Sequence, residues 1–260
     1  MKTKTLMLLA LGAGLKIALI AGLAWHHAAR AAETDVTPLL QAADRYRTGA
    51  DRLQVETLVT TTRRDGSADK ERRYTVFVQD QHRSLVLMKS PAEAGQKVLM
   101  LGDDFWLLMP GSQRPVRITP SQKLLGDAST GDIATLSWAE DYDGQLVGEE
   151  RCDADGTARP CLHLTLQARR KGVSYQRIEL WLGKARREPL RADLYVQSDK
   201  LAKQARFVLD KAGTLVSEML LQDELGNHAM TRVQYLARQP RAVPENWLNP
   251  MFLARNPSLE

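Results

Sequence analysis

The 260-residue sequence lacks the residue groupings on which most enzymes and metal proteins depend. Outside the first 32 residues its histidines are His82, His163 and His228, and none has a second ligand at metal-binding spacing. No G-x-S-x-G nucleophile motif and no glycine-rich phosphate loop occurs in the chain. The sequence therefore gives no reason to expect an enzyme, a metal site or any other cofactor.

Cysteine is scarce. The two cysteines, Cys152 and Cys161, bracket a turn-rich segment between two expected strands. In an oxidising compartment a disulfide closing this short loop is the default expectation. Loop entropy gives it a stabilising effect of about 2–3 kcal/mol.

Long apolar runs are also scarce, and the one clear case stands at the start of the chain. Residues 6–25 are largely apolar, Lys2 and Lys4 precede them, and small residues at 29–32 offer a cleavage site. This order is typical of a secretory signal peptide. We therefore expect residues 1–32 to be removed on export.

The alternative is that the run stays in the membrane as an anchor, since about 20 apolar residues can span a bilayer. Lys16 lies in the middle of the run, and a charge there disfavours stable insertion. Cleavage is the favoured prediction, with residues 33–260 forming one periplasmic domain.

The basic excess of the chain also belongs mostly to this leader. The formal net charge is +5, and four basic side chains, with no acidic one, lie in residues 1–32. Removing that segment leaves a formal charge of about +1. No nucleic-acid partner is therefore expected.

Alternating apolar and polar residues dominate the rest of the sequence. Leu53, Val55 and Thr57, for example, recur at every second position, as in a strand with one buried face. We expect thirteen such strands, six before and seven after a short helical segment at 132–139. Their even spacing and short turns predict a mainly β fold, as one curved antiparallel sheet, a barrel or a sandwich.

Helical segments are expected at both ends of these strands. Thr37 can cap a helix that has Pro38 at its first position and ends at Gly49. At the other end, a proline-containing tail is expected to pack Trp247, Met251 and Phe252 across an open end of the sheet.

Two neighbouring strands, at 98–101 and 105–109, are apolar on both alternating faces. A polar turn at 102–104 joins them into a hairpin. Both apolar faces of such a hairpin must be shielded from water, and the protein's own core can shield only one of them. This pattern favours a protein that binds a hydrophobic ligand.

The same region carries an ordered set of residues: a proline and a glycine, an apolar strand, Gly-Asp, a Trp-containing strand that ends in proline, two arginines and Ser-x-x-Leu-Leu-Gly. These are Pro91, Gly95, residues 98–101, Gly102, Asp103, Trp106, Pro110, Arg114, Arg117, Ser121, Leu124, Leu125 and Gly126. The order resembles that of the outer membrane lipoprotein-sorting proteins related to LolA. Later positions also fit, so the resemblance covers most of the chain beyond residue 32.

The resemblance implies a half-open, antiparallel β-barrel with an N-terminal helix and a short helical lid over an apolar cavity. It also implies a periplasmic carrier that binds its cargo, lipoprotein acyl chains or another lipid, in this cavity. Such a carrier moves this cargo from an inner-membrane ABC or RND-type exporter towards the outer membrane. We expect it to be a monomer. Small residues at 127–131 precede Asp132 where relatives tend to carry an aromatic residue, which suggests a looser lid or a different cargo.

The candidate cargo-binding residues follow from this reading. The walls are predicted to be Leu99, Leu101, Trp106 and Leu108. The lid contacts are predicted to be Ile133, Leu136 and Trp138. The predicted contacts with an anionic headgroup or a partner are Arg114 and Arg117.

Other interpretations stay open at this point. The wall residues can equally be ordinary core. A protein of similar fold can act as a periplasmic sensor, regulator or accessory subunit that binds lipoproteins or a transporter without carrying cargo. A third interpretation is an enzyme that acts on lipids.

Overall fold

A computed structural model describes residues 35–80, 82–119, 137–154, 156–225 and 228–255. The chain divides into two units, Met1–Glu33 and Thr34–Glu260, and all described residues belong to the second. None of the helices among these residues has the length and apolar character needed to cross a membrane.

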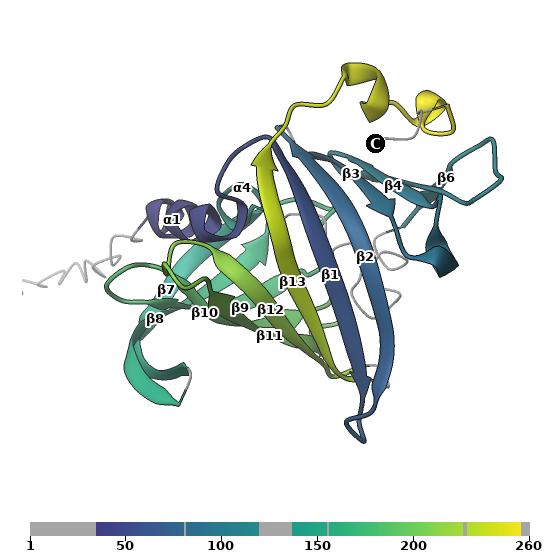
Figure 1. Ribbon diagram of the computed structural model, residues 1–260. Coiled ribbons are helices and arrows are strands. Elements are labelled where there is room, and N and C mark those ends of the chain that lie inside the picture. Colours follow the sequence, from purple (N-terminus) through teal and green to yellow (C-terminus); the bar gives the residue numbers. More distant parts are fainter. Residues whose placement is uncertain (1–34, 81, 120–136, 155, 226–227, 256–260) are drawn as a thin grey trace, which may run out of the picture. The chain divides into compact units, whose positions relative to one another are not determined.

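Helix α1 (Thr37–Thr48) leads into the sheet (Figure 1). Its N-cap is Val36 instead of the predicted Thr37, whose backbone N–H donates to Asp35 Oδ1 at 2.9 Å. The predicted end is confirmed: Gly49 has a φ of 75°, and its N–H donates to the carbonyl of Arg45. Glycine adopts this left-handed conformation without a Cβ penalty.

The strands form one continuous antiparallel sheet with the order β6-β5-β4-β3-β2-β1-β13-β12-β11-β10-β9-β8-β7. The bounds are β1 (Leu53–Arg63), β2 (Ala68–Gln79), β3 (Arg83–Met88), β4 (Lys97–Leu101), β5 (Asp104–Leu108), β6 (Val116–Ile118), β7 (Tyr142–Ala154), β8 (Thr157–Ala168), β9 (Arg177–Gly183), β10 (Pro189–Tyr195), β11 (Leu201–Leu209), β12 (Val216–Asp223) and β13 (His228–Pro240). The short helices are η1 (Pro91–Glu93), α4 (Trp138–Asp141), η2 (Glu245–Leu248) and η3 (Pro250–Phe252).

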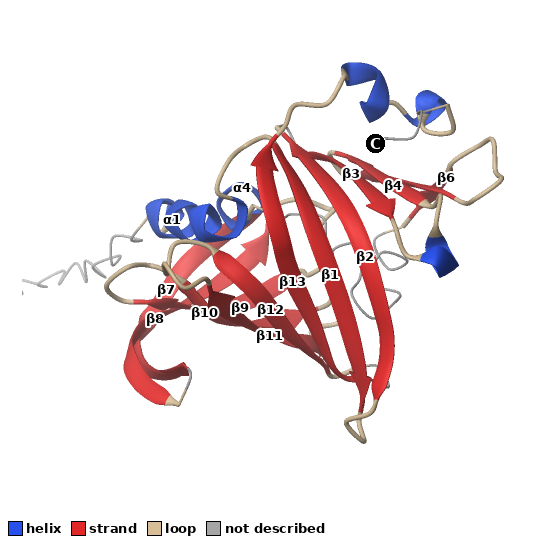
Figure 2. Cartoon of the chain, viewed as in Figure 1, coloured by secondary structure: helices blue, strands red, loops and turns tan. Residues whose placement is uncertain are grey.

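The sheet is curved and unclosed, because β6 and β7 end the strand order instead of pairing with each other. Figure 2 shows the strands as one bent wall, with α1 and α4 together on it and the C-terminal helical turns near β3 and β4. This confirms the predicted mainly β class with thirteen strands, an N-terminal helix and a short second helix.

The two faces of the sheet bury different apolar clusters. We call the face that packs with α1 and Trp138 the inner face. Its cluster contains Leu40 of α1, Val55 of β1 and Val98 of β4, with many further Leu, Ile, Val and aromatic side chains. Since successive side chains on a strand point to opposite faces, Val98 lies on the inner face and Leu99 on the outer face.

The described part of the C-terminal segment covers the outer face over β2 to β5. There Phe77, Leu85 and Leu99 pack with Leu248 and Leu253 from the tail. The ring of Trp247 meets that of Phe77 edge to face, with centroids 5.8 Å apart. The tail therefore adds a small second core on the outer side of the sheet.

This placement corrects the expectation that the tail covers an open end. Trp247 does pack, but against the outer face of the sheet. Met251 is 78% exposed and Phe252 40% exposed, so these two side chains do not close a cavity.

Candidate functional site

Helices α1 and α4 meet over one end of the inner face, and Asp44 holds them together. Its carboxylate accepts hydrogen bonds from the hydroxyl of Ser137 and from the backbone N–H groups of Trp138 and Ala139, at 3.0, 3.1 and 3.0 Å. A carboxylate suits the first N–H groups of a helix because they have no partner within the helix. An α1 side chain thus fixes the position of Trp138.

Trp138 is buried on the inner face. Its ring packs edge to face on Phe207 of β11, with centroids 5.7 Å apart, and the Arg47 guanidinium lies 4.1 Å from its ring centroid. The residue predicted to contact cargo from a lid is therefore placed over the inner face. Ile133 and Leu136, the other two predicted lid residues, lie outside the described residues.

A small cavity lies beside Trp138, between the end of α1 and the inner face of β1, β2 and β13. Its volume is about 10 Å³. The lining residues are Arg47, Thr48, Leu53, Val55, Thr57, Val76, Val78, Tyr235 and Arg238. Apolar strand residues make its floor, and two arginines contribute its only charged side chains among the described residues.

A larger polar pocket of about 610 Å³ adjoins this cavity and shares Thr48 and Val78 with it. The pocket is lined by Gln41, Asp44, Arg45, Thr48, Ala50, Asp51, Val78, Gln79, Asp80, His82, Ser137, Ala139 and Glu140. The two hollows therefore lie next to each other under α1.

A polar network ties the two halves of the unclosed sheet together near this pocket. Asp141 of α4 is fully buried and pairs with Arg170, in the connection between β8 and β9, at 2.6 Å. Arg170 also pairs with Asp103, in the turn between β4 and β5, at 2.7 Å. His82 approaches Asp141 to 3.4 Å and Glu140 to 3.2 Å.

Both free edges of the sheet leave apolar side chains in contact with solvent. On the β6 side Val116 is 62% exposed, and its pairing with Leu107 places it on the inner face. On the β7 side Leu146 is 39% exposed, and its pairing with the buried Leu164 places it on the inner face too. Apolar inner-face surface therefore continues to the opening of the sheet.

The four predicted wall residues lie on the other side of the sheet. Leu99 and Leu108 are buried beneath the C-terminal segment, and the half-buried Leu101 and Trp106 pack around them. The structure brings these four together but separates them from Trp138 by the thickness of the sheet. Their contact with cargo stays a prediction. At these strands the inner face carries their neighbours Val98, Met100, Phe105 and Leu107 instead.

The predicted headgroup arginines are both exposed. Arg117 pairs with Asp104 on the neighbouring strand, and the two side chains are 62% and 42% exposed. Arg114 lies in the loop before β6, where its backbone bonds to Ser112. Neither points to a buried site, and their role stays a prediction.

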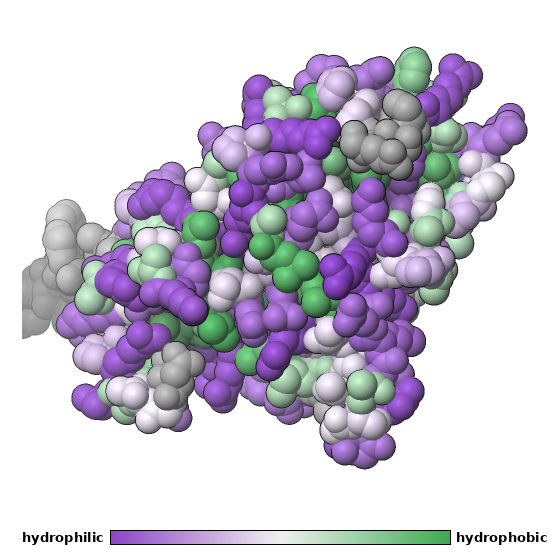
Figure 3. Space-filling model, viewed as in Figure 1, coloured by the Kyte–Doolittle hydropathy of each residue, from purple (hydrophilic) through white to green (hydrophobic). Residues whose placement is uncertain are grey.

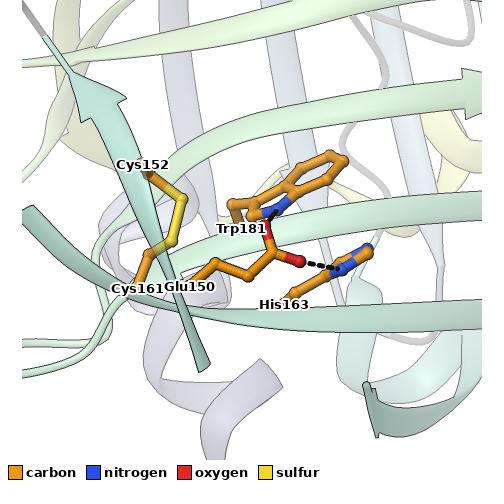
Figure 4. Close-up of a disulfide and its surroundings, with 5 residues drawn as sticks. All are labelled: Glu150, Cys152, Cys161, His163 and Trp181. Atoms are coloured by element: carbon orange, nitrogen blue, oxygen red, sulfur yellow. Dashed lines mark hydrogen bonds and ion pairs between the residues drawn. A yellow bond between two sulfur atoms is a disulfide. The ribbon is translucent and has the colours of Figure 1, made fainter. Parts of the chain in front are cut away.

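The disulfide joins Cys152 and Cys161 across the β7–β8 pair (Figure 4). Next to it, on the outer face, Glu150 accepts a hydrogen bond from the Trp181 indole at 3.0 Å and contacts His163 at 2.8 Å. The His163 ring stacks on Trp181 with centroids 4.4 Å apart. The hydrogen bond from Trp181 is the main cause that lowers the pKa of Glu150.

A further pocket of about 260 Å³ lies over β10 to β13, where Arg191, Gln204, Arg206, Leu220, Leu221, Gln222 and Met230 line it. Among the described residues no group of three or more His, Cys, Asp and Glu side chains is arranged to hold a metal ion. Figure 3 shows a largely hydrophilic face, with hydrophobic residues visible near the middle of the view and in smaller patches elsewhere. The inner face and the two hollows under α1 are therefore the candidate site.

A comparison with family models places the chain in a family. A model described as "Uncharacterized protein" matches residues 80–255, which is more than half of the chain. The chain belongs to that family. No curated protein matches it at the level of significance applied.

Several solved structures are similar in fold to this chain. A LolA superfamily protein from Nitrosomonas europaea is 28% identical, with a TM-score of 0.73, over 83% of this chain and 97% of its own. A putative outer membrane lipoprotein-sorting protein domain from Vibrio parahaemolyticus is 17% identical, with a TM-score of 0.65, over 84% and 98%. A DUF1329 family protein from Desulfovibrio piger is 22% identical, with a TM-score of 0.64, over 82% and 95%. The sheet and its helices thus have the LolA superfamily fold.

Proposed function

We propose that this protein is a periplasmic carrier that binds lipoprotein acyl chains, or another lipid, on its inner face. In this proposal it receives the lipid from an inner-membrane ABC or RND-type exporter and moves it towards the outer membrane as a monomer, with no catalytic step. The LolA superfamily fold is consistent with such a role, and a protein domain of this fold from Vibrio parahaemolyticus is named as a putative outer membrane lipoprotein-sorting protein.

One observation carries the proposal: the apolar inner face reaches the opening of an unclosed sheet. Val116 and Leu146 remain exposed on the two edge strands, while residues such as Val98 and Leu164 continue the same surface inward. An apolar surface that runs from solvent into the interior suits a chain-like apolar ligand better than a compact polar one.

The energy available from such binding is sufficient for a carrier. Each buried CH₂ group contributes about 0.8 kcal/mol, so a chain of a dozen carbons yields several kcal/mol even after the entropy lost on binding. A carrier must also release its ligand, which a moderate affinity of this kind allows.

Two further features fit an exported protein. The expected signal at residues 1–32 would send the chain to the periplasm, and the Cys152–Cys161 disulfide suits an oxidising compartment. We include cleavage of this signal in the proposal.

The test measures binding of Nile red, an uncharged apolar dye, to residues 33–260 purified without detergent. We expect saturable binding with one strong site and competition by long-chain lipids. Val116→Asp, which puts a charge on the inner face at the β6 edge, should weaken binding by about tenfold, since a charged group in an apolar contact costs more than 1.4 kcal/mol.

Leu225→Asp is the matched control. Leu225 is 57% exposed, close to the 62% of Val116, but lies after β12 and away from the free edges. This variant should bind Nile red as the unmodified protein does. Equal losses in both variants, or no saturable binding at all, would contradict the proposal.

A further inference from the structure

The small cavity under α1 combines an apolar floor with two guanidinium groups. Leu53, Val55 and Val76 contribute apolar side chains, whereas Arg47 and Arg238 contribute positive charge. Arginine rarely lines an apolar interior unless it meets an anionic or planar polar partner. Apolar packing on the inner face therefore does not explain why the positive charges of Arg47 and Arg238 lie there.

Arg238 reaches the cavity because of its register. It pairs with Val55 on β1, whose side chain belongs to the inner-face cluster. Its guanidinium donates to the carbonyl oxygens of Val216 at 2.6 Å and Arg47 at 3.5 Å, and lies 4.6 Å from the Tyr235 ring centroid. No described carboxylate lies within ion-pair distance of it. Its hydrogen-bond acceptors are thus neutral carbonyl groups, while the negative charge of Asp210 also acts on it.

Burial has a measurable effect on this side chain. Desolvation lowers the pKa of Arg238 from its ordinary value, which means that its charge is held in a poorly solvated place. An arginine remains charged in proteins, so the positive charge persists there. An anion placed beside it would recover part of the lost solvation.

Arg47 approaches the same cavity from the last turn of α1. Its guanidinium lies over the Trp138 ring and 3.2 Å from a carboxylate oxygen of Asp44. The two Asp44 oxygens also accept the three hydrogen bonds from residues 137–139. The Asp44 carboxylate therefore stabilises the N-terminus of α4 in addition to its ion pair with Arg47.

Thr57 supplies the second, independent sign of a ligand. It lines the cavity from β1, is only 2% exposed, and its hydroxyl has no hydrogen-bond partner. A buried hydroxyl left without a partner costs about 1–3 kcal/mol, so native structures seldom keep one without a function. A hydroxyl and two guanidinium groups around one hollow are all able to donate to an anion.

We propose that this cavity binds the carboxylate or phosphate of an anionic amphiphile, with Arg238, Arg47 and Thr57 donating hydrogen bonds to it. The apolar tail of the ligand lies along the inner face of β1 and β2. This inference rests on the proposed function and names the ligand class: a lipid with an anionic headgroup. The cavity of about 10 Å³ holds roughly one water, so its lining side chains must move apart to admit a headgroup.

The test compares dodecanoate with dodecanol, which has the same chain length but no charge, as competitors of Nile red. Dodecanoate should bind about tenfold more tightly, the effect expected of a charge-assisted hydrogen bond. Arg238→Gln should abolish this preference and leave the dodecanol affinity unchanged. Thr57→Val should reduce the preference, and Arg238→Lys should keep most of it.

Arg206→Gln is the control, because Arg206 is exposed on the outer face and pairs with Leu220. It should leave the preference for dodecanoate intact. Circular dichroism of each variant checks that the sheet is unchanged, and Thr57→Val, which should reduce the preference, keeps the test valid if Arg238→Gln fails to fold.

The outcomes separate this inference from the proposed function. Equal affinity for dodecanoate and dodecanol overturns the headgroup site while the carrier proposal stands. Failure of both to compete overturns the carrier proposal as well. If inorganic phosphate alone binds in an Arg238-dependent way and dodecanoate shows no preference, the site belongs to a free anion and the headgroup assignment is wrong.

Discussion

The carboxylate of Asp141 is fully buried, and one of its oxygens lies 2.6 Å from Nη1 of Arg170. Arg170 is 20% exposed and forms a second ion pair with Asp103. These contacts connect α4 and the end of β8 to the turn between β4 and β5. They tie together parts of the sheet that the strand order keeps far apart.

Removing Arg170 should therefore destabilise the fold strongly. Arg170→Ala leaves the buried Asp141 carboxylate without its main cation, and breaking such a buried pair costs about 3–5 kcal/mol. Urea unfolding followed by circular dichroism measures the loss. Arg169→Ala is the matched control, because Arg169 pairs with Asp143 and the two side chains are 49% and 69% exposed. Exposed pairs contribute at most about 1 kcal/mol, so similar losses in the two variants would contradict this role of Arg170.

The disulfide should stabilise the β7–β8 hairpin. Its cysteines are 9 residues apart in sequence, and closing a loop of this length contributes about 2–3 kcal/mol in the loop-entropy model. Replacing both cysteines with alanine should lower the free energy of unfolding by that amount. Reduction of the unmodified protein should give the same shift in the urea midpoint, whereas the double variant should not respond to reductant. A double variant as stable as the oxidised protein would refute the estimate.

Glu150 should titrate below its ordinary range. The hydrogen bond from Trp181 lowers its pKa, because it stabilises the ionised carboxylate. A carboxyl with a lowered pKa in the folded state adds stability above its unfolded pKa, and this stability is lost as the pH falls through the folded pKa.

Trp181→Phe removes the indole donor and should raise the pKa of Glu150 towards its ordinary value. Carboxyl titration by NMR measures this shift directly. Trp247→Phe, a change on the outer face near Phe77, serves as the control and should leave the Glu150 titration where it is. A Glu150 pKa that does not move in the Trp181 variant would show that the hydrogen bond is not its cause.

The two faces of β4 should respond differently to truncation. Leu99 is fully buried under the C-terminal segment and Met100 is 4% exposed on the inner face. Either residue changed to alanine should cost about 2–5 kcal/mol of stability. Only Met100→Ala should weaken Nile red binding. Weaker binding in Leu99→Ala, with Met100→Ala unchanged, would contradict the inner-face site and favour Leu99 as a wall residue.

The strands could be predicted from the sequence because the pattern that marks a strand is local in the chain. Alternation along 53–59 and the turn residues between strands are enough to count thirteen strands, and Gly49 marks the end of α1 by its need for a positive φ. The Cys152–Cys161 bridge was predictable for the same reason, since its partners lie on adjacent strands of one hairpin.

The site was harder to predict because it depends on contacts that are distant in sequence. Strands β4 and β5 are apolar on both faces, so alternation alone cannot tell Val98, on the inner face, from Leu99, which the tail covers. Asp44 is 94 residues from Trp138, and Arg47 approaches Arg238 across 191 residues. No local pattern marks such pairs. The one available signal was an arginine, Arg238, that directly follows the run Tyr235, Leu236 and Ala237.

The most direct test of the carrier proposal is mass spectrometry of organic extracts from residues 33–260, purified from the periplasm without detergent. The proposal predicts a lipid or acylated peptide at close to one molecule per protein, and its loss in Val116→Asp but not in Leu225→Asp. A protein that carries no lipid, and stays empty after incubation with membranes, would contradict it.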